Sequence, residues 1–200
     1  MKLLMGNELY TEVIQDKLLH ARESVWIATA NVKAMMVKME KGSDRFVPIV
    51  EVFTKLAQNK VELRLLHAEL PSRPFRAAFD KQQGLVQGGL QLKVCPRVHF
   101  KCVIVDGGFL YLGSANLTGA GLGAKSDNRR NFEIGTTSED FTVIDNVCAM
   151  FNEIWTGKKC ADCQRRNVCP DPIGKPEAYT KLRTRKQKRR RHSVVAIWKS

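Results

Sequence analysis

The spacing of apolar residues in the first half of the chain switches between a helical period and short continuous runs. Residues 8–22 carry leucine, valine and isoleucine side chains at helical intervals, which predicts a helix. Residues 47–59, with a proline in the first turn, and residues 74–83 predict two more helices. Between them, the apolar runs at residues 24–32 and 61–67 predict buried strands.

The second half of the chain predicts more strands and a closing helix. Residues 91–95, 100–106 and 109–115 predict three short strands joined by turns, and residues 131–137 predict a fourth. An amphipathic pattern over residues 139–155 predicts the last helix. Because strands and helices alternate, we expect an α/β sandwich in which helices flank a mixed β-sheet.

Length and charge divide the chain into three parts. A chain of 200 residues is long enough for one packed domain with an appendage. The net charge is +13, and nine basic residues with no acidic one follow from Lys181 to the end, so the rest of the chain carries only +4. We therefore expect a folded catalytic domain at residues 1–156, a small cysteine-rich segment at 157–176 and a basic, flexible tail at 177–200.

The sequence also bears on the compartment. No apolar run approaches the length of a membrane span. The apolar run within the first ten residues is also too short for the apolar region of a secretion signal. Six cysteines in such a chain indicate reduced thiols or metal ligands rather than a disulfide framework. We therefore expect a cytoplasmic protein without integral membrane contact.

The candidate catalytic residues lie in one stretch, residues 99–118, which reads HFKCVIVDGGFLYLGSANLT. In a strand, His99 and Lys101 project from the same face, and the returning strand brings Ser114 and Asn116 beside them. A neutral imidazole is a competent nucleophile near pH 7, and a lysine with an amide can bind phosphoryl oxygens. Because no acidic cluster that would hold magnesium accompanies these residues, we expect phosphodiester chemistry that requires no metal.

The spacing His99-x-Lys101-x4-Asp106-x6-Gly113-Ser114-x-Asn116 resembles the signature of the phospholipase D superfamily. Asn131-x-Glu133 is similar to an element that often follows it. The resemblance implies that His99 attacks phosphorus and forms a phosphohistidine. The other implied roles are binding of phosphoryl oxygens by Lys101, Ser114 and Asn116, a hydrogen bond from the second ring nitrogen of His99 to Glu133, and a supporting role for Asp106 in the turn.

The family uses two such motifs per active site, and this chain has one. The resemblance to short single-motif nucleases therefore implies a symmetric homodimer that pairs His99 with its copy. The alternative is that His99 is a core histidine in a strand that happens to precede Gly-Ser-Ala-Asn. His67, at the end of a predicted strand, is interpreted as a structural histidine rather than one that reaches the site.

Basic residues favour nucleic acid, DNA or RNA, as the substrate. From Lys181 to Arg191, eight of eleven residues are basic. The residues expected to contact substrate are Asn131, Lys125, Arg129, Arg130, Lys186, Arg189 and Arg190, with Arg73 and Arg76 as further candidates. The alternatives are a tail that only aids solubility, a phospholipid hydrolase or phosphatidyltransferase, and an idle nucleic-acid-binding subunit. A helicase or a repair or defence complex could act as partner.

The segment Cys160-x2-Cys163-x5-Cys169 suggests a structural metal, because closely spaced thiolates can share one ion or cluster. The spacing resembles the iron–sulfur staple of certain repair and CRISPR-adaptation nucleases, in which a distant cysteine is the fourth ligand. Cys148 is the candidate for that position, ahead of Cys95 and Cys102. Zinc, an iron–sulfur cluster and metal-free thiols all remain open.

Overall fold

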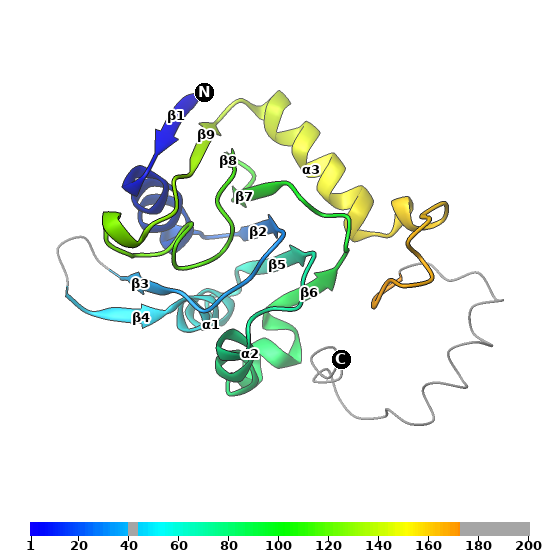
Figure 1. Cartoon of the computed structure of the whole chain (residues 1–200), viewed down its shortest axis with the longest axis horizontal. Helices are drawn as coiled ribbons and strands as arrows, with labels where there is room; N and C mark the ends of the chain where they lie inside the picture. Colours follow the sequence, from blue (N-terminus) through cyan, green and yellow to red (C-terminus); the bar gives the residue numbers. More distant parts are fainter. Residues whose placement is uncertain (40–43, 173–200) are drawn as a thin grey trace.

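A seven-stranded mixed sheet forms the centre of the computed structural model, which describes residues 1–39 and 44–172 (Figure 1). Its strand order is β1-β9-β8-β7-β2-β5-β6, with β2, β5 and β6 parallel and every other pair antiparallel. The strands of this sheet are β1 (Lys2–Met5), β2 (Ser24–Thr29), β5 (Glu62–His67), β6 (Gln91–Val94), β7 (Lys101–Val105), β8 (Phe109–Gly113) and β9 (Ile134–Ser138). A separate ribbon pairs β3 (Met36–Lys38) with β4 (Phe46–Pro48).

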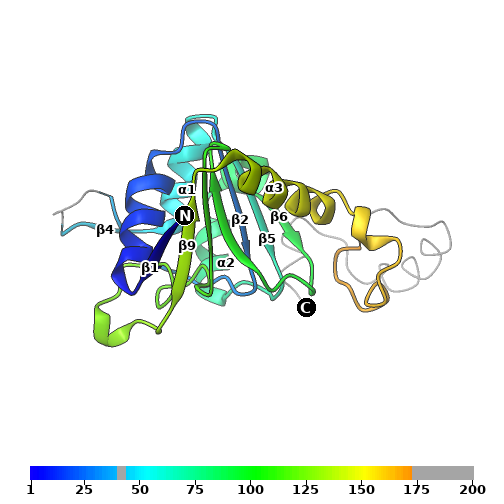
Figure 2. The ribbon, with the colours of Figure 1, turned by 90° about the horizontal axis from the view of Figure 1, so that it is seen from above.

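Helices cover both faces of the sheet, which confirms the expected α/β sandwich (Figure 2). One face carries the larger core and is covered by η1 (Leu9–Lys17), α1 (Ile49–Gln58), α2 (Arg73–Asp80) and η3 (Leu85–Gly89). In the described part of the chain, the other face is covered by α3 (Phe141–Trp155). Short helical turns complete the described chain: η2 (Leu18–His20), η4 (Asp127–Arg129) and η5 (Lys158–Cys160). Among the helices of the described residues, none has the length and apolar character needed to cross a membrane.

Helix α3 is fixed to its face of the sheet by stacked aromatic rings. The ring of Phe151 lies 5.4 Å from Trp26 and 5.6 Å from Trp155, both in stacked geometry. The guanidinium of Arg64 lies over both indoles, at 4.5 and 5.5 Å, an arrangement in which a cation and an aromatic ring attract each other. Asp140 caps the start of the helix by accepting hydrogen bonds from the backbone N–H of Thr142 and Val143.

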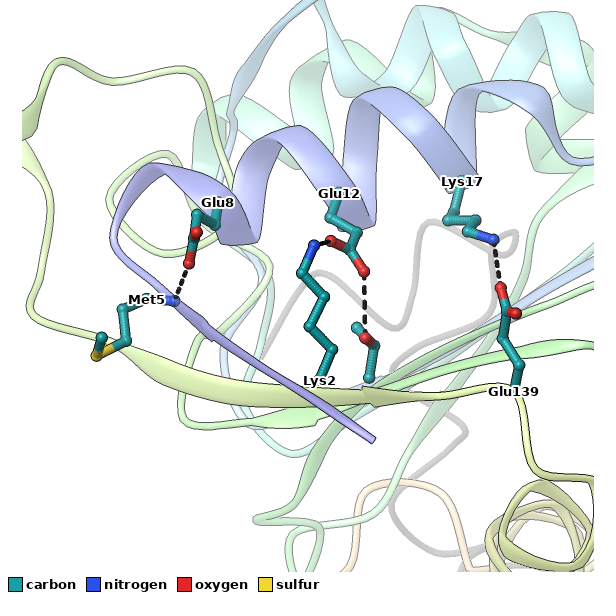
Figure 3. A network of polar contacts seen from close by, with 7 residues as sticks. Lys2, Met5, Glu8, Glu12, Lys17 and Glu139 are labelled. Atoms are coloured by element: carbon teal, nitrogen blue, oxygen red, sulfur yellow. Dashed lines mark hydrogen bonds and ion pairs between the residues drawn. The ribbon is translucent and has the colours of Figure 1, made fainter.

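The free edge of the sheet is tied to helix η1 by polar contacts (Figure 3). Glu12 pairs with Lys2 of β1 and accepts a hydrogen bond from Thr137 of β9 at 3.1 Å. Lys17 reaches Glu139 at 2.7 Å, just after β9. These contacts hold β1 in place although its sequence gave no alternating pattern, which is why the strand was not predicted.

Three differences from the sequence-based prediction concern strand ends. The strand expected at residues 131–137 begins only at Ile134, and the one expected at 109–115 ends at Gly113. The β7 strand begins at Lys101, so His99 precedes it. In each case the polar residues beyond the strand make hydrogen bonds outside the ladder, as described below. The β3–β4 ribbon was also not predicted, because each strand has only three residues.

Asp106 joins the end of β7 to the start of β2. Its backbone is in the left-handed region, with φ of 51°, and its N–H donates to the Ser24 oxygen at 2.9 Å. Its carboxylate accepts hydrogen bonds from the backbone N–H groups of Arg22, Glu23 and Ser24 at 2.8 to 3.2 Å. Burial acts to raise the pKa of Asp106, but the N–H donors outweigh burial and hold the pKa below its usual value. Asp106 thus fixes the far end of the strand pair that carries the motif.

We expect Asp106→Asn to lower the free energy of unfolding by about 1–2 kcal/mol near neutral pH, because the amide keeps the shape but loses the charged acceptor. A carboxylate whose folded pKa is depressed stabilises the fold above its unfolded pKa and loses that contribution as pH falls through the folded pKa. The difference between wild type and variant should therefore shrink below about pH 4.

Urea unfolding at a series of pH values measures this difference. Asp145→Asn, at an exposed carboxylate on α3, is the matched control and should change stability little. A difference between wild type and Asp106→Asn that stays constant or grows on acidification would contradict the role given to Asp106.

Candidate active site at one end of the sheet

The motif residues meet at one end of the sheet because the strands that carry them run antiparallel. Lys101, at the start of β7, pairs with Gly113 at the end of β8, and Gly113 pairs with Gly135 near the start of β9. On the other side of β7, β2 also ends at this end of the sheet, since Ala28 pairs with Cys102. Four strand ends therefore place their flanking polar residues together.

His99 and Lys101 are adjacent, although only Lys101 lies in the strand. The ammonium of Lys101 donates a hydrogen bond to the His99 carbonyl oxygen at 2.7 Å, so its side chain folds back toward the histidine. The His99 ring is exposed and forms no hydrogen bond within residues 1–39 and 44–172. It borders a hollow of about 520 Å³ whose other lining residues are Ala30, Ala68, Glu69, Pro96, Arg97, Val98 and Arg165. The imidazole is accessible to a ligand in this hollow.

Asn116 is oriented by the end of β2. Its Oδ1 accepts a hydrogen bond from the backbone N–H of Asn31 at 3.1 Å and lies 3.0 Å from the Thr29 hydroxyl. That hydroxyl also accepts the N–H of Leu117 at 3.2 Å. Because the carbonyl end of the amide is engaged by donors, the Nδ2 end is left to donate to an anion. Thr29 and the backbone of Asn31 are functional partners that the sequence analysis missed, since a threonine closing an apolar run gives no distinct signal.

Ser114 and Glu133 form a pair across β8 and β9. The Ser114 hydroxyl donates to Glu133 Oε2, and the N–H of Ile134 donates to the Ser114 Oγ at 3.1 Å. Asn131 Nδ2 donates to Glu133 Oε1 at 3.1 Å. The expected hydrogen bond from the His99 ring to Glu133 is not present among the described residues. The reason is topological: β8 lies between the strands that carry these two residues, so Glu133 meets Ser114 first.

Tyr111 packs against the backbone that carries Ser114. It is fully buried, its hydroxyl accepts the N–H of Ala115 at 3.3 Å, and burial raises its pKa to about 12. Its ring passes so close to Gly113 and Gly135 that a Cβ at either position would lie 2.3 Å from a tyrosine atom. Gly113 of the motif is therefore required by this close approach, which keeps Ser114 directly beside β9.

His67 and Asp106 do not line the hollow. Asp106 lies at the opposite end of β7, where its carboxylate accepts hydrogen bonds from the backbone of residues 22–24. His67 is fully buried at the end of β5, where its Nδ1 lies 2.9 Å from the Glu69 carbonyl oxygen, to which it can donate. Burial lowers the pKa of His67, which favours the neutral ring. The interpretation of His67 as a structural histidine agrees with this position.

The basic residues expected to bind substrate differ in accessibility. Lys125 and Arg129 are exposed in the loop before Asn131. Arg130 corrects the expectation: its side chain is 3% exposed, and its guanidinium donates to the Gly121 and Gly123 carbonyls and to Asn7. It holds the loop together instead of facing a substrate. Arg73 and Arg76 of α2 do not line the hollow, and Lys186, Arg189 and Arg190 lie outside the described residues.

Four cysteines line a second cavity, of about 300 Å³, beside the hollow; they are Cys95, Cys160, Cys163 and Cys169. Cys148, the fourth ligand suggested by the sequence, does not line it and packs instead on the core beneath α3. There it lies near the buried Cys102, whose pKa burial raises to about 12. In the described part of the chain, no three His, Cys, Asp or Glu side chains are close enough together to hold a metal ion as they stand.

Solved structures with the same fold include a member of the phospholipase D family. Nuc from Salmonella typhimurium, described as a phospholipase D family member, has a TM-score of 0.54 and 16% identity over 77% of this chain and 93% of that one. NucT from Helicobacter pylori has a TM-score of 0.51 and 17% identity, covering 77% and 94%. TrmBL2, an archaeal chromatin protein, has a TM-score of 0.51 and 17% identity over 76% of this chain but only 50% of its own.

A comparison with curated protein sequences gives no match. Residues 14–155 match the family model described as cardiolipin synthase, PLD-like domain. This range contains His99, Lys101, Asp106, Ser114, Asn116 and Glu133 and most of the sheet. The chain belongs to the phospholipase D-like family and has its phosphodiesterase fold.

Proposed function

We propose that this protein is a nuclease that cleaves phosphodiester bonds through His99 without a catalytic metal. The observation that carries the proposal is the group of His99, Lys101, Ser114 and Asn116 at one end of the sheet. An accessible imidazole stands beside a fixed cation, and Asn116 has its amide donor oriented by β2. Such preorganised donors stabilise the charge that develops on a phosphoryl group during attack.

The reaction we propose has two displacements. First, an unprotonated ring nitrogen of His99 attacks phosphorus, the bond to the leaving oxygen breaks, and the His99 of a second copy gives that oxygen a proton. Then the second histidine takes a proton from water, the water oxygen attacks phosphorus, and the phosphorus–nitrogen bond breaks. Lys101 and Asn116 bind the non-bridging oxygens in both steps.

Nucleic acid is the proposed substrate because of charge. Exposed Lys125 and Arg129 precede Asn131 in sequence, and Arg97 and Arg165 line the hollow that holds His99. The basic run from Lys181 to Arg191 adds further phosphate-binding capacity. TrmBL2, which shares the fold, is described as binding DNA. The family model is named for a cardiolipin synthase, so phosphatidyl transfer is the second candidate and is tested in parallel.

A homodimer is part of the proposal because the chain carries one motif histidine and exposes an apolar surface next to the site. This edge patch consists of Leu3, Met5, Phe132 and Ile134. Leu3 and Met5 are 55% and 56% exposed on β1, and Ile134, which pairs with Met5, is 52% exposed. The Ser114 N–H donates to the Ile134 carbonyl at 2.9 Å, so the backbone at one end of the patch contacts a motif residue. We propose that a second copy binds this edge patch and supplies the second histidine.

We expect His99→Ala to lower cleavage of labelled DNA or RNA at least about a thousandfold, because the nucleophile is lost. The assay is run in excess EDTA, with single- and double-stranded substrates and with phospholipid vesicles. His20→Ala, at an exposed histidine on η2, is the matched control and should cleave at the wild-type rate.

Cleavage that needs an added divalent metal, or near-wild-type activity of His99→Ala, would contradict the mechanism. Turnover of phospholipid alone would favour phosphatidyl chemistry. Binding of nucleic acid without cleavage by the wild type would indicate the idle subunit.

We expect Ile134→Lys to convert the protein to monomers and to abolish cleavage while His99 is intact, because a buried lysine at the interface has no partner. Light scattering after gel filtration gives the mass of the assembly, and the cleavage assay gives the rate. Phe46→Lys, at an exposed apolar residue on β4 outside the edge patch, should change neither. A monomeric wild type with full activity would contradict the dimer.

A further inference from the structure

The structure brings together four cysteines that lie far apart in the sequence. Cys95 follows β6, where its N–H donates to the His67 carbonyl at 2.8 Å, and Cys160, Cys163 and Cys169 follow α3. All four line the same cavity of about 300 Å³. Cys95 and Cys160 both lie near the thiol of Cys169. Cys95, set aside in the sequence analysis, thus takes the position expected for Cys148.

The segment that carries three of these cysteines has little else to hold it. Residues 157–172 contain one large aliphatic side chain, Val168, and it is 78% exposed. The backbone runs in successive tight turns, in which the N–H of Cys163, Arg166 and Cys169 donates three residues back. Buried Arg166 donates to the Cys160 carbonyl at 2.6 Å. A segment with so small an apolar core is typical of one stabilised by a metal or a cross-link.

The charged residues that line the cavity are mostly basic. Its lining contains five basic residues, Lys93, Arg97, Lys159, Arg165 and Arg166, and one acidic residue, Asp171. The backbone of Arg165 and the side chain of Arg97 form hydrogen bonds with Cys163. Nearby cations stabilise the deprotonated sulfur that binds soft metals and offset the negative charge of several thiolates.

We propose that Cys95, Cys160, Cys163 and Cys169 form a four-thiolate metal centre that closes when zinc or an iron–sulfur cluster binds. The thiols line the cavity without converging on one point, and metal sites of this kind commonly assemble only with the metal. Zinc and iron–sulfur clusters share this ligand chemistry, and metal analysis distinguishes them.

Such a centre would also fix the approach to the proposed active site. Residues 95–99 run from the first ligand directly to His99, and Pro96, Arg97 and Arg165 line both the cysteine cavity and the hollow. Binding a metal at Cys95 would therefore hold this loop and place two guanidinium groups beside the imidazole. The metal centre itself does not depend on the nuclease proposal, because it is tested by metal content.

The test is the metal and acid-labile sulfide content of the full chain, purified without oxygen, for wild type, Cys95→Ser and Cys148→Ser. We expect wild type and Cys148→Ser to hold equal amounts, either one zinc ion per chain or iron with sulfide, and Cys95→Ser to lose most of it. Cys148→Ser is the matched control because it removes a half-buried cysteine outside the cavity.

A second measurement keeps the test valid if a variant folds poorly. Circular dichroism checks the fold of each variant, and cobalt added to wild-type chain stripped of metal reports the number of thiolates through its absorption bands. A four-thiolate spectrum for wild type and for Cys148→Ser supports the centre. Equal metal retention by Cys95→Ser, loss of metal in Cys148→Ser, or a wild type that takes up neither zinc, cobalt nor iron with sulfide would overturn it.

Discussion

The pairing of β7 with β8 is the constraint on which the candidate site depends. Its register places Lys101 opposite Gly113, which brings both ends of the motif to one end of the sheet. A slip of one residue would turn the whole strand over, since side chains alternate between faces. Two features hold the register: Asp106 binds three backbone N–H groups at one end, and the Tyr111 ring packs on Gly113 and Gly135 at the other.

The site uses backbone and neighbouring strands to orient side chains before a ligand binds. Asn116 is set by the N–H of Asn31 and the Thr29 hydroxyl, and Ser114 is set by Glu133 and the N–H of Ile134. The Asn116 amide, fixed in this way, needs little rearrangement when charge develops on a phosphoryl group. His99 differs from them, because its ring has no such hydrogen bond in the described chain and borders an open hollow. The proposed second copy and the proposed metal centre at Cys95 would complete its environment.

The sequence predicted the sheet, its mixed character and the central motif because these depend on local patterns. Buried strands such as β2 and β5 are continuous apolar runs, and the spacing from His99 to Asn116 is itself a pattern. Contacts between distant segments could not be predicted in the same way. Whether Glu133 meets His99 or Ser114 depends on strand order, and whether Cys95 or Cys148 joins the other cysteines depends on where β6 ends. The burial of Arg130 likewise follows from a loop fold that no periodicity encodes.

The central claim is that His99 forms a covalent bond to phosphorus. The most direct measurement is rapid quenching of the reaction into alkali with a substrate labelled at the scissile phosphate, followed by mass mapping of the protein. The account predicts a single adduct on His99, stable to alkali and released by acid, which appears before product and disappears with turnover. An adduct on another residue, or cleavage by wild type at full rate with no adduct at any time, would contradict it.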